Sequence, residues 1–251
     1  MTLPPVPESF SWTESPAGLV LTCRPLDAVT PHLFTTRQLQ LTADDWRRVA
    51  GLLGARQAVT LNQVHGRDVV VVRAGAPPPV GQPTGDVLVS DDPAAAIAVR
   101  AADCAPLLLA DTRSGAAAAV HAGWRGTAAG AAAAAVDALR QHFGAAPGNL
   151  IVAIGPSIGA CCYEVGSDVV DAFAAAGHPR HLVDRWFVVR NARLYLDVAG
   201  ANRDQLVLAG VPDAQIHDCR LCTAMHLDVL TSYRAERERA GRMAGAIRAR
   251  A

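Results

Sequence analysis

Four side chains that could act together in catalysis lie within one short, otherwise apolar stretch of the sequence. Asp103, Cys104, His121 and Arg125 are embedded among Ala, Val, Leu and Gly residues. A carboxylate, a thiol, an imidazole and a guanidinium beside apolar strand-like runs have little packing role. His65 lies in an earlier turn between two β-rich runs. We predict that these five residues form an enzyme site.

The residue types at three of these positions suit a metal ion. His65, Cys104 and His121 offer two imidazoles and a thiolate, each at a predicted strand end. Three protein ligands leave a fourth position open, as catalytic zinc sites require. Their spacing matches no short zinc motif. A Cys–His hydrolase, with Cys104 as nucleophile and either histidine as base, is an equally valid interpretation of the same residues.

The segment His121-Ala-Gly-Trp-Arg-Gly126 precedes a predicted helix and has the character of an anion site. Its two glycines allow a sharp turn that exposes backbone N–H groups at a helix N-terminus. Arg125 adds a planar fork of donors. Asp103 is expected to orient a ligand or to move a proton, although an ordinary strand-to-helix turn would look similar.

The cysteines suggest a competing metal site. Cys219-Arg-Leu-Cys222, with His217 and His226, could bind an ion or form a redox pair. The Cys161-Cys162 pair could contribute, although adjacent cysteines seldom bind one ion together. In a cytoplasmic chain, six cysteines are expected to be thiols or metal ligands rather than a disulfide framework.

Composition limits the possible functions. Of the 251 residues, 51% are hydrophobic and 18% are charged, which supplies a large core, and the net charge is zero. A neutral chain argues against nucleic acid or a membrane surface as main partner. Every cationic residue is Arg, which excludes Schiff-base lysines and P-loops. Without an apolar run of roughly 20 residues or a signal-peptide pattern, a cytoplasmic location is expected.

Periodicity and turn signals predict alternating strands and helices. Predicted strands cover residues 18–23, 32–36, 58–64, 68–73, 86–90, 95–100, 106–111, 116–120, 150–154, 186–189, 194–196 and 215–219. Predicted helices cover residues 42–53 (capped by Thr42), 127–143 (capped by Thr127 and ended by Gly144), 168–177 and 198–210. A Pro/Gly loop is expected at 76–85, and a basic, exposed tail from Arg234. The irregular alternation, with hairpins, favours one α+β domain over residues 1–251 with mixed sheets.

The sequence resembles the YfiH/laccase-domain family over roughly residues 30–247. The motifs that carry this resemblance are Asn62-Gln-Val-His-Gly66, Gly85-Asp-Val-Leu-Val-Ser90, Ala102-Asp-Cys-Ala-Pro-Leu107, Val120-His-Ala-Gly-Trp-Arg-Gly126, Ile154-Gly-Pro-Ser-Ile-Gly-Ala-Cys-Cys-Tyr-Glu-Val-Gly166, Leu196-Asp-Val-Ala-Gly-Ala-Asn-Arg-Asp-Gln-Leu206, Cys222-Thr, Ser232-Tyr-Arg234 and Gly241-Arg-Met-Ala244. The resemblance implies a layered α/β/β/α domain and a catalytic zinc ion on His65, Cys104 and His121, with copper as the alternative metal.

The family has been given several activities. It was first labelled a polyphenol oxidase, that is, a multicopper laccase. Later assignments are purine nucleoside phosphorylase, acting on adenosine, inosine, guanosine and methylthioadenosine, and adenosine deaminase. One branch instead edits peptidoglycan precursors by removing a misincorporated amino acid from nucleotide-linked muramic acid. The resemblance therefore implies small-molecule substrates, a purine nucleoside and phosphate among them.

The residues favour the nucleoside activities over laccase chemistry. Of the eight histidines, only two lie in family motifs, and a multicopper oxidase needs more imidazoles. Arg125 is a natural phosphate ligand, and an open zinc position suits deamination. Catalytic roles are thus expected for Asp103, Arg125 and Cys104. Substrate binding is expected for Arg125, Asp86 and Asn202, and Ser90 and Cys162 are further candidates for the pocket wall.

The sequence departs from the family near its start. After Phe34-Thr-Thr-Arg37 the family usually has a Gly-Gly-Val-Ser stretch and a longer loop. Here residues 38–45 run almost directly into a predicted helix. If the family loop closes over substrate, this chain has a more open or differently selective pocket.

Overall fold

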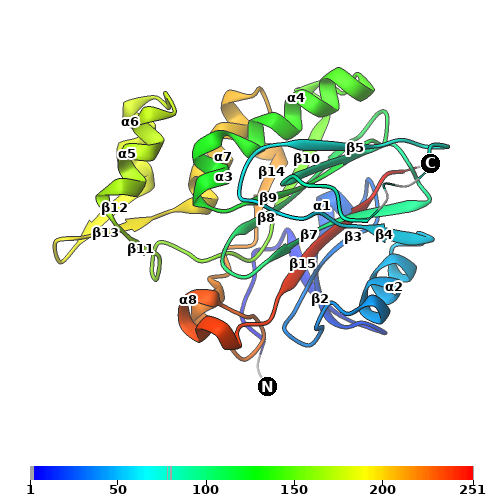
Figure 1. The fold of residues 1–251 in the computed structure, drawn as a ribbon, viewed down its shortest axis with the longest axis horizontal. Helices are drawn as coiled ribbons and strands as arrows, with labels where there is room; N and C mark the ends of the chain where they lie inside the picture. The colour runs from blue at the N-terminus through cyan, green and yellow to red at the C-terminus, as the bar shows by residue number, and fades with distance from the viewer. Residues whose placement is uncertain (1–2, 78, 80, 251) are drawn as a thin grey trace.

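Two six-stranded β-sheets face each other at the centre of the molecule (Figure 1). The computed structural model describes residues 3–77, 79 and 81–250. The extreme ends of the predicted 1–251 domain and two positions of the predicted loop at 76–85 lie outside the described residues. Within the described part, no helix combines the length and the apolar character needed to cross a membrane.

The first sheet has the strand order β1–β2–β3–β15–β7–β4. Its strands are β1 (Phe10–Ser15), β2 (Gly18–Cys23), β3 (His32–Thr35), β15 (Met243–Arg248), β7 (Ala95–Ala101) and β4 (Gln57–Val59). All neighbours are antiparallel except β4 and β7, which run parallel. The predicted pairing of 18–23 with 32–36 is confirmed, whereas β1 was not predicted.

The second sheet has the order β14–β10–β8–β9–β6–β5. Its strands are β14 (Ile216–Asp218), β10 (Leu150–Ile154), β8 (Ala105–Asp111), β9 (Ala117–Ala122), β6 (Val87–Ser90) and β5 (Val69–Val72). The two outer pairs are parallel and the inner pairs are antiparallel. Both sheets are therefore mixed, as predicted, and β8 with β9 forms the predicted hairpin.

Alternating side chains of the central strands fill two separate cores. On β8, Leu108 and Ala110 pack between the sheets, whereas Leu107 and Leu109 point to the opposite face. Successive side chains of a strand point to opposite faces, so a strand that is buried on both faces reads as continuously apolar. This explains the uninterrupted Leu and Ala runs of the sequence.

Helices cover the two outer faces and complete the α/β/β/α layering. The helix α2 (Ala43–Leu52) packs on the first sheet, and α4 (Ala131–Phe143) and α7 (Val198–Leu208) pack on the second. The predicted Thr42 cap of α2 is confirmed, since its side chain and that of Asp45 form a reciprocal capping box. Other short helices of the large unit are α1 (Arg24–Asp27), α3 (Trp124–Ala129) and α8 (Tyr233–Glu236). It also contains 3-10 turns at Pro147–Asn149, Asp213–Gln215, Thr223–Met225 and Arg237–Arg239.

A smaller unit lies to one side of the two large sheets (Figure 1). It contains a third sheet of β11 (Glu164–Val165), β13 (Arg193–Leu196) and β12 (Phe187–Arg190), together with α5 (Ser167–Ala175) and α6 (Arg180–Trp186). Phe173 packs edge-on against Trp186 and Phe187 and forms a separate apolar cluster. The helix α6 was not predicted, because the segment before Trp186 carries few apolar residues.

The predicted helix at 127–143 is two helices. The first, α3, begins at Trp124, and Gly130 (φ 85°) adopts a left-handed conformation that separates α3 from α4. Thr127 therefore lies inside α3 and is not a cap. The run of alanines masks this break, because the single glycine within it is the only local signal. The predicted end at Gly144 (φ 68°) is confirmed.

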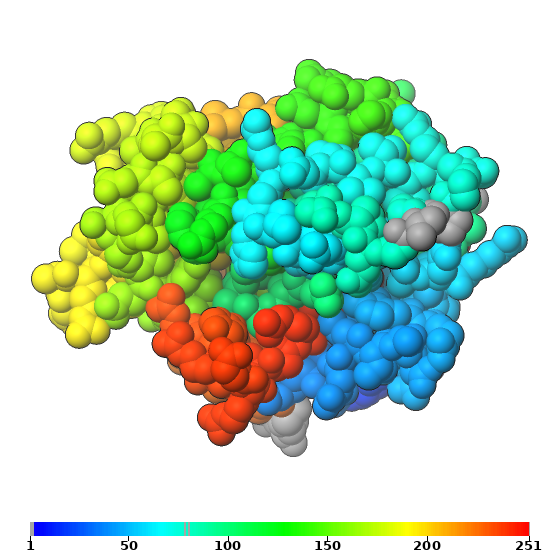
Figure 2. Space-filling model, in the orientation of Figure 1, coloured from blue at the N-terminus to red at the C-terminus, as the bar shows by residue number. Residues whose placement is uncertain are grey.

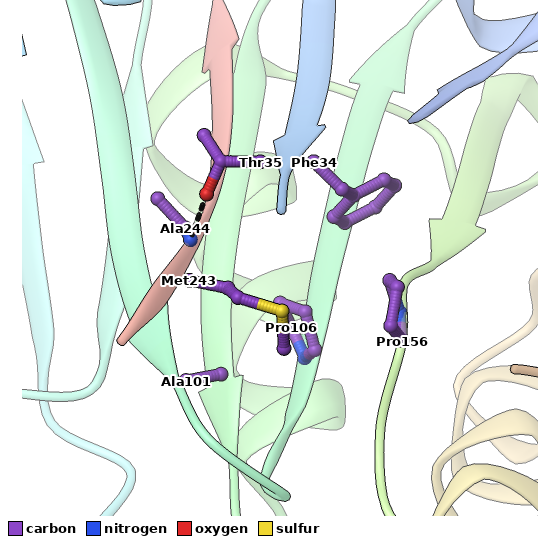
Figure 3. Close-up of a pocket in the computed structure, with 7 residues that line it drawn as sticks. All are labelled: Phe34, Thr35, Ala101, Pro106, Pro156, Met243 and Ala244. Atoms are coloured by element: carbon purple, nitrogen blue, oxygen red, sulfur yellow. Dashed lines mark hydrogen bonds between the residues drawn. The ribbon is translucent and has the colours of Figure 1, made fainter. Parts of the chain in front are cut away.

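The prediction of an exposed tail from Arg234 is wrong in its last part. The strand β15 lies between β3 and β7 in the first sheet and is buried from Met243 to Ile247. Figure 3 shows Thr35 Oγ1 accepting from the backbone N–H of Ala244 (2.8 Å), with the Met243 side chain directed at Pro106. The segment is rich in Ala, Gly and Arg rather than β-branched residues, so its composition did not indicate a strand.

Candidate active site

Cys104 and His121 are brought together by the register of the β8–β9 hairpin. The antiparallel pairing sets Ala105 opposite Ala122 and Pro106 opposite His121. Cys104, immediately before β8, therefore lies beside the end of β9. Both residues thus lie at adjacent ends of two central strands of the second sheet, the start of β8 and the end of β9.

His65 completes the group from the connection between β4 and β5. It adopts a left-handed backbone conformation (φ 62°), and its ring lies edge-on to that of His121 with centroids 4.9 Å apart. One ligand atom of each of His65, Cys104 and His121 lies within 4.8 Å of the others. We call these three residues the His–Cys–His group.

The absence of a side chain at Gly123 gives Cys104 and His65 room to approach each other. A Cβ atom at this position would lie 2.6 Å from Cys104 Sγ and 3.2 Å from His65 Cδ2. The turn between β9 and α3 therefore requires glycine here for close approach, rather than for an unusual φ angle.

Asp86 supports the group from behind. It is fully buried just before β6, and its Oδ1 accepts from His121 Nδ1 at 2.8 Å. Its carboxylate also accepts from the backbone N–H groups of Val64 (3.2 Å), His65 (3.0 Å) and Gly66 (2.7 Å). A carboxylate on the far nitrogen fixes the tautomer and the ring orientation of a metal-binding histidine. Asp86 thus orients His121 and holds the turn of His65.

The local electrostatics favour a thiolate at Cys104. Burial raises the pKa of the Cys104 thiol, but hydrogen bonds with His121 and His65 outweigh it and lower the pKa to about 7. Burial lowers the pKa of His121, but its hydrogen bonds to Asp86 and Cys104 outweigh this and raise the pKa to about 9. A thiolate is both the metal-binding and the nucleophilic form of cysteine.

The donor set of the group fits one transition-metal ion. Two imidazoles and a thiolate converge, His121 is oriented by a carboxylate, and the His65 side is exposed. Three protein ligands with an open side are typical of a catalytic rather than a structural site.

Asp103 is an anchor for a distant segment of the chain. Its backbone has a positive φ of 86°, and its buried carboxylate accepts from Thr223 Oγ1 and from the backbone N–H of Arg234, each at 2.6 Å. Both oxygens thus have protein donors. The contacts tie the loop before Thr223 and the start of α8 to the position beside Cys104.

A cavity of about 720 Å³ opens over the His–Cys–His group. Its lining residues are Gln63, His65, Arg100, Ala101, Ala102, Asp103, Cys104, His121, Trp124, Arg125, Tyr163, Tyr233, Arg234, Arg237, Glu238 and Arg242. On the face shown in Figure 2, the cyan, green and orange-red parts of the chain meet, and these parts carry the turn before β5, helix α3 and helix α8. In total, the lining residues come from five separate parts of the chain, at 63–65, 100–104, 121–125, 163 and 233–242.

The pocket wall is both cationic and aromatic. It carries five arginines and three aromatic side chains against two carboxylates, one of which is the fully bonded Asp103. The Arg125 guanidinium lies over the Trp124 ring at 4.2 Å, and that of Arg234 over Tyr163 at 5.2 Å. Such a wall suits a ligand with an anionic part and a flat ring.

Most predicted site residues meet in this pocket, but four do not line it. Asp86, which was predicted to bind substrate, is fully buried behind His121 and does not reach the pocket. Asn202 is buried between helices, where its amide donates to Thr127 Oγ1 (2.9 Å) and the Val198 carbonyl (2.8 Å). Ser90 is buried on β6, where its hydroxyl accepts from the Asp92 N–H (3.0 Å). The fourth, Cys162, has other cysteines as neighbours. Their motif positions reflect packing of the fold around the pocket.

The competing Cys219-Arg-Leu-Cys222 site is not formed as predicted. Cys219 is buried in the core between the sheets. Cys222 instead lies with Cys161 and Cys162. The left-handed Arg220 (φ 56°) lies between Cys219 and Cys222 in the chain.

The short loop after Arg37 does not line the pocket. Among the described residues that line the cavity, none comes from 38–45. Arg37 forms an ion pair with Glu236 of α8 (2.9 Å), and α8 contributes to the pocket wall.

Several pocket residues were not predicted as site residues. These are Gln63, Arg100, Trp124, Tyr163, Tyr233, Arg234, Arg237, Glu238 and Arg242. Six of them lie inside the motifs of the family resemblance, namely Gln63, Trp124, Tyr163, Tyr233, Arg234 and Arg242. The available signal was an aromatic residue directly before an arginine in such a motif, as at Trp124-Arg125 and Tyr233-Arg234.

The chain belongs to the family described as multi-copper polyphenol oxidoreductase laccase, whose model matches residues 38–250. The fold agrees, since the crystal structure of the Bacillus licheniformis hypothetical protein YfiH superposes with a TM-score of 0.83 at 29% identity, covering 92% of this chain and 96% of that one. The predicted family and the predicted α+β fold are confirmed.

Relatives in this family are named as enzymes of nucleosides. A Deinococcus radiodurans protein named purine nucleoside phosphorylase is 40% identical over 247 residues, covering 90% of this chain and 91% of its own length. A protein of an unknown prokaryotic organism, named adenosine deaminase RL5, is 40% identical over 141 residues, covering 55% of this chain and 52% of its own length.

Proposed function

We propose that this protein is a zinc-dependent purine nucleoside phosphorylase that also deaminates adenosine. The observation that carries the proposal is the pocket, in which the His–Cys–His group, an arginine-rich wall and stacking aromatic rings adjoin one another. The names of the relatives point to the same substrates. Adenosine, inosine, guanosine and methylthioadenosine are the substrates to be tested.

His65, Cys104 and His121 would hold the ion, and zinc is the metal best matched to two imidazoles and one thiolate. When bound, zinc supplies Lewis acidity to a substrate oxygen or to water. Asp86 keeps His121 in the metal-binding tautomer through the 2.8 Å contact to Nδ1. Copper is the alternative ion, but the described residues bring together only one imidazole-containing group, which does not favour multicopper oxidase chemistry.

Phosphorolysis requires that the protein bind a phosphate anion beside the ribose of the nucleoside. Phosphate attacks C1′, the bond from C1′ to N9 breaks, and the purine leaves with a proton while ribose 1-phosphate forms. We assign the phosphate to Arg125, whose guanidinium is exposed in the pocket and lies over the Trp124 ring. The rings of Trp124, Tyr163 and Tyr233 would stack on the purine.

Deamination would use the same pocket with water in place of phosphate. Water adds at C6 of adenosine and ammonia leaves, so inosine forms without cleavage of the glycosidic bond.

Asp103 already accepts two protein hydrogen bonds, and we therefore propose that it positions Cys104 and α8 rather than transferring a proton.

The test is to incubate purified, zinc-containing protein with adenosine, with and without phosphate, and to separate the products by chromatography. Phosphate-dependent adenine indicates phosphorolysis, and phosphate-independent inosine indicates deamination. The absence of both products from zinc-loaded protein would refute the proposal.

A second candidate function is favoured by the number of arginines in the pocket. Arg100, Arg234, Arg237 and Arg242 line it in addition to Arg125, which suits a substrate with several negative charges. Nucleotide-linked muramic acid carrying a misincorporated amino acid is such a substrate. Release of serine or glycine from that conjugate, without turnover of adenosine, would support the editing hydrolase instead.

A further inference from the structure

Three thiols converge at a second place in the fold. Cys161 and Cys162 lie in the turn after β10, and Cys222 lies in the loop after β14. Their sulfur atoms all lie within 4.8 Å of one another. We call these residues the thiol cluster. No member of it is among the described residues that line the 720 Å³ pocket, so the mechanism above makes no use of them.

The two segments that carry the thiol cluster are joined by backbone hydrogen bonds. Ser157 and Cys222 form an isolated parallel bridge. The Ser157 N–H donates to the Leu221 carbonyl (3.2 Å), and the Thr223 N–H donates to the Ser157 carbonyl (3.0 Å). The convergence of Cys222 with the pair is therefore set by the main chain rather than by flexible side chains.

The turn itself is also held in shape. The N–H groups of Cys162 (2.9 Å) and Tyr163 (3.0 Å) both donate to the Gly159 carbonyl. The Arg190 guanidinium donates to the Cys161 carbonyl (3.2 Å) and brings a positive charge to the turn. The turn thereby aims two consecutive sulfur atoms at Cys222, an arrangement that adjacent cysteines seldom reach.

One sulfur already receives a hydrogen bond suited to a thiolate. The backbone N–H of Gly159 points at Cys222 Sγ (3.3 Å). Donors aimed at a ligating sulfur stabilise its negative charge and belong to the outer shell of metal sites. Cys222 is buried and Cys161 is exposed, so the thiol cluster has a fixed inner ligand and an open side for entry of an ion.

A disulfide accounts for these thiols less well than an ion does. Adjacent Cα atoms are about 3.8 Å apart, whereas disulfides usually span about 4.4–6.8 Å between Cα atoms, which disfavours a Cys161–Cys162 bond. A bond from Cys222 to either of them leaves the third thiol unused. Three sulfurs about 2.3 Å from one zinc ion lie roughly 4 Å apart, which is within the observed spacing.

We propose that Cys161, Cys162 and Cys222 bind one thiophilic cation, of the zinc or monovalent copper class, independently of the His–Cys–His group. Thiolates select these soft ions over magnesium or calcium. The ion would brace the loop that carries Thr223, whose hydroxyl donates to Asp103 beside Cys104 (2.6 Å). The second site would therefore stabilise one wall of the pocket.

The test counts bound ions by native mass spectrometry after reduced, metal-free protein is titrated with Cd²⁺, and in a parallel series with Cu⁺. Wild-type protein is expected to bind two Cd²⁺ ions per chain. Cys222→Ser should bind one, and the Cys104→Ser/His121→Ala double variant should also retain one. Cys219→Ala, which alters the other cysteine of the same segment, is the matched control and should still bind two.

One ion in the wild-type protein, or two in Cys222→Ser, would overturn the proposal. If circular dichroism shows that Cys222→Ser is unfolded, Cys161→Ser decides, because this exposed side chain can be changed without disturbing the core. Cys161→Ser is expected to lose the second ion, and its retention with unchanged affinity would overturn the proposal.

Discussion

The buried carboxylate of Asp86 holds two of the three proposed metal ligands in place. Asp86 is fully buried and receives four hydrogen bonds, one from the imidazole and three from the turn of His65. It therefore acts on two members of the His–Cys–His group at once. A neutral amide at this position would turn its N–H donors toward groups that are themselves donors.

We therefore predict that Asp86→Asn weakens zinc binding by about 10–100-fold, the usual cost of losing such a partner. Competition with a chromophoric chelator measures this affinity directly. Asp111→Asn is the control, since Asp111 is an equally buried carboxylate at the opposite end of β8. Equal zinc affinity of Asp86→Asn and wild-type protein would contradict the assigned role.

Arg125 is the residue at which the phosphate assignment can be tested. Removing a charge-assisted hydrogen bond to a phosphate costs about 1.5–3 kcal/mol, so Arg125→Ala should raise the KM for phosphate by roughly 10–100-fold. The KM for adenosine should change much less. Arg67→Ala is the control, because Arg67 is exposed near α3 but does not line the pocket. An unchanged KM for phosphate would remove Arg125 from the anion site.

At the scale of elements, the turn between β9 and α3 determines whether the ligands can approach one another. Gly123→Ala would introduce a methyl group 2.6 Å from Cys104 Sγ. Overpacking of this kind costs about 1–3 kcal/mol, and we predict at least about a fivefold loss of zinc affinity with a parallel loss of activity. Gly148→Ala, at a position with nothing within 4 Å of the added methyl, is the control. Calorimetric zinc titration of both variants distinguishes a local clash from a general loss of stability.

The elements that carry the His–Cys–His group could be predicted because their signals are local. The apolar runs of β8 and β9 flank a short turn, which fixes the hairpin and brings Cys104 near His121. The third ligand, His65, was predicted from its turn and from a family motif. Its distance from the other two depends on tertiary packing, which periodicity does not encode.

The remaining wall of the pocket depends on contacts between distant segments. Residues 233–242 reach the pocket because Asp103 accepts from the Arg234 N–H and because β15 inserts between β3 and β7. Neither interaction can be recognised from the sequence of this segment, whose composition is that of a basic tail. The same reason explains why the thiol cluster was predicted only in part, as a possible contribution of Cys161 and Cys162 to a site with Cys222. Cys222 meets this pair through the bridge at Ser157, which is a tertiary contact.

At the scale of the whole molecule, a buried histidine in the first sheet couples folding to pH. His32 accepts a hydrogen bond from the Cys23 N–H at Nε2 (2.8 Å), which requires a neutral ring. Burial lowers the pKa of His32 to about 4. The unfolded chain, with a pKa near 6.5, binds this proton first, so its contribution to stability is present above pH ~6.5 and is lost as the pH falls toward ~4.

We predict that the free energy of unfolding falls by on the order of 3 kcal/mol through this group between pH ~6.5 and ~4. Denaturant titrations across that range should show a shallower pH dependence for His32→Gln than for wild-type protein. His181→Gln, which alters an exposed imidazole, serves as control and should keep the wild-type slope. Parallel curves for His32→Gln and wild-type protein would show that His32 does not titrate in this way.

We propose that nucleoside turnover requires a metal ion on His65, Cys104 and His121. The most direct measurement is phosphate-dependent release of adenine from adenosine by protein stripped with a chelator and then reloaded with measured equivalents of zinc. We predict that activity is lost on stripping and returns in proportion to the zinc held by wild-type protein, whereas Cys104→Ser stays inactive although it remains folded. Full activity of the metal-free protein, abolished by alkylation of Cys104, would contradict the zinc assignment and identify Cys104 as a nucleophile.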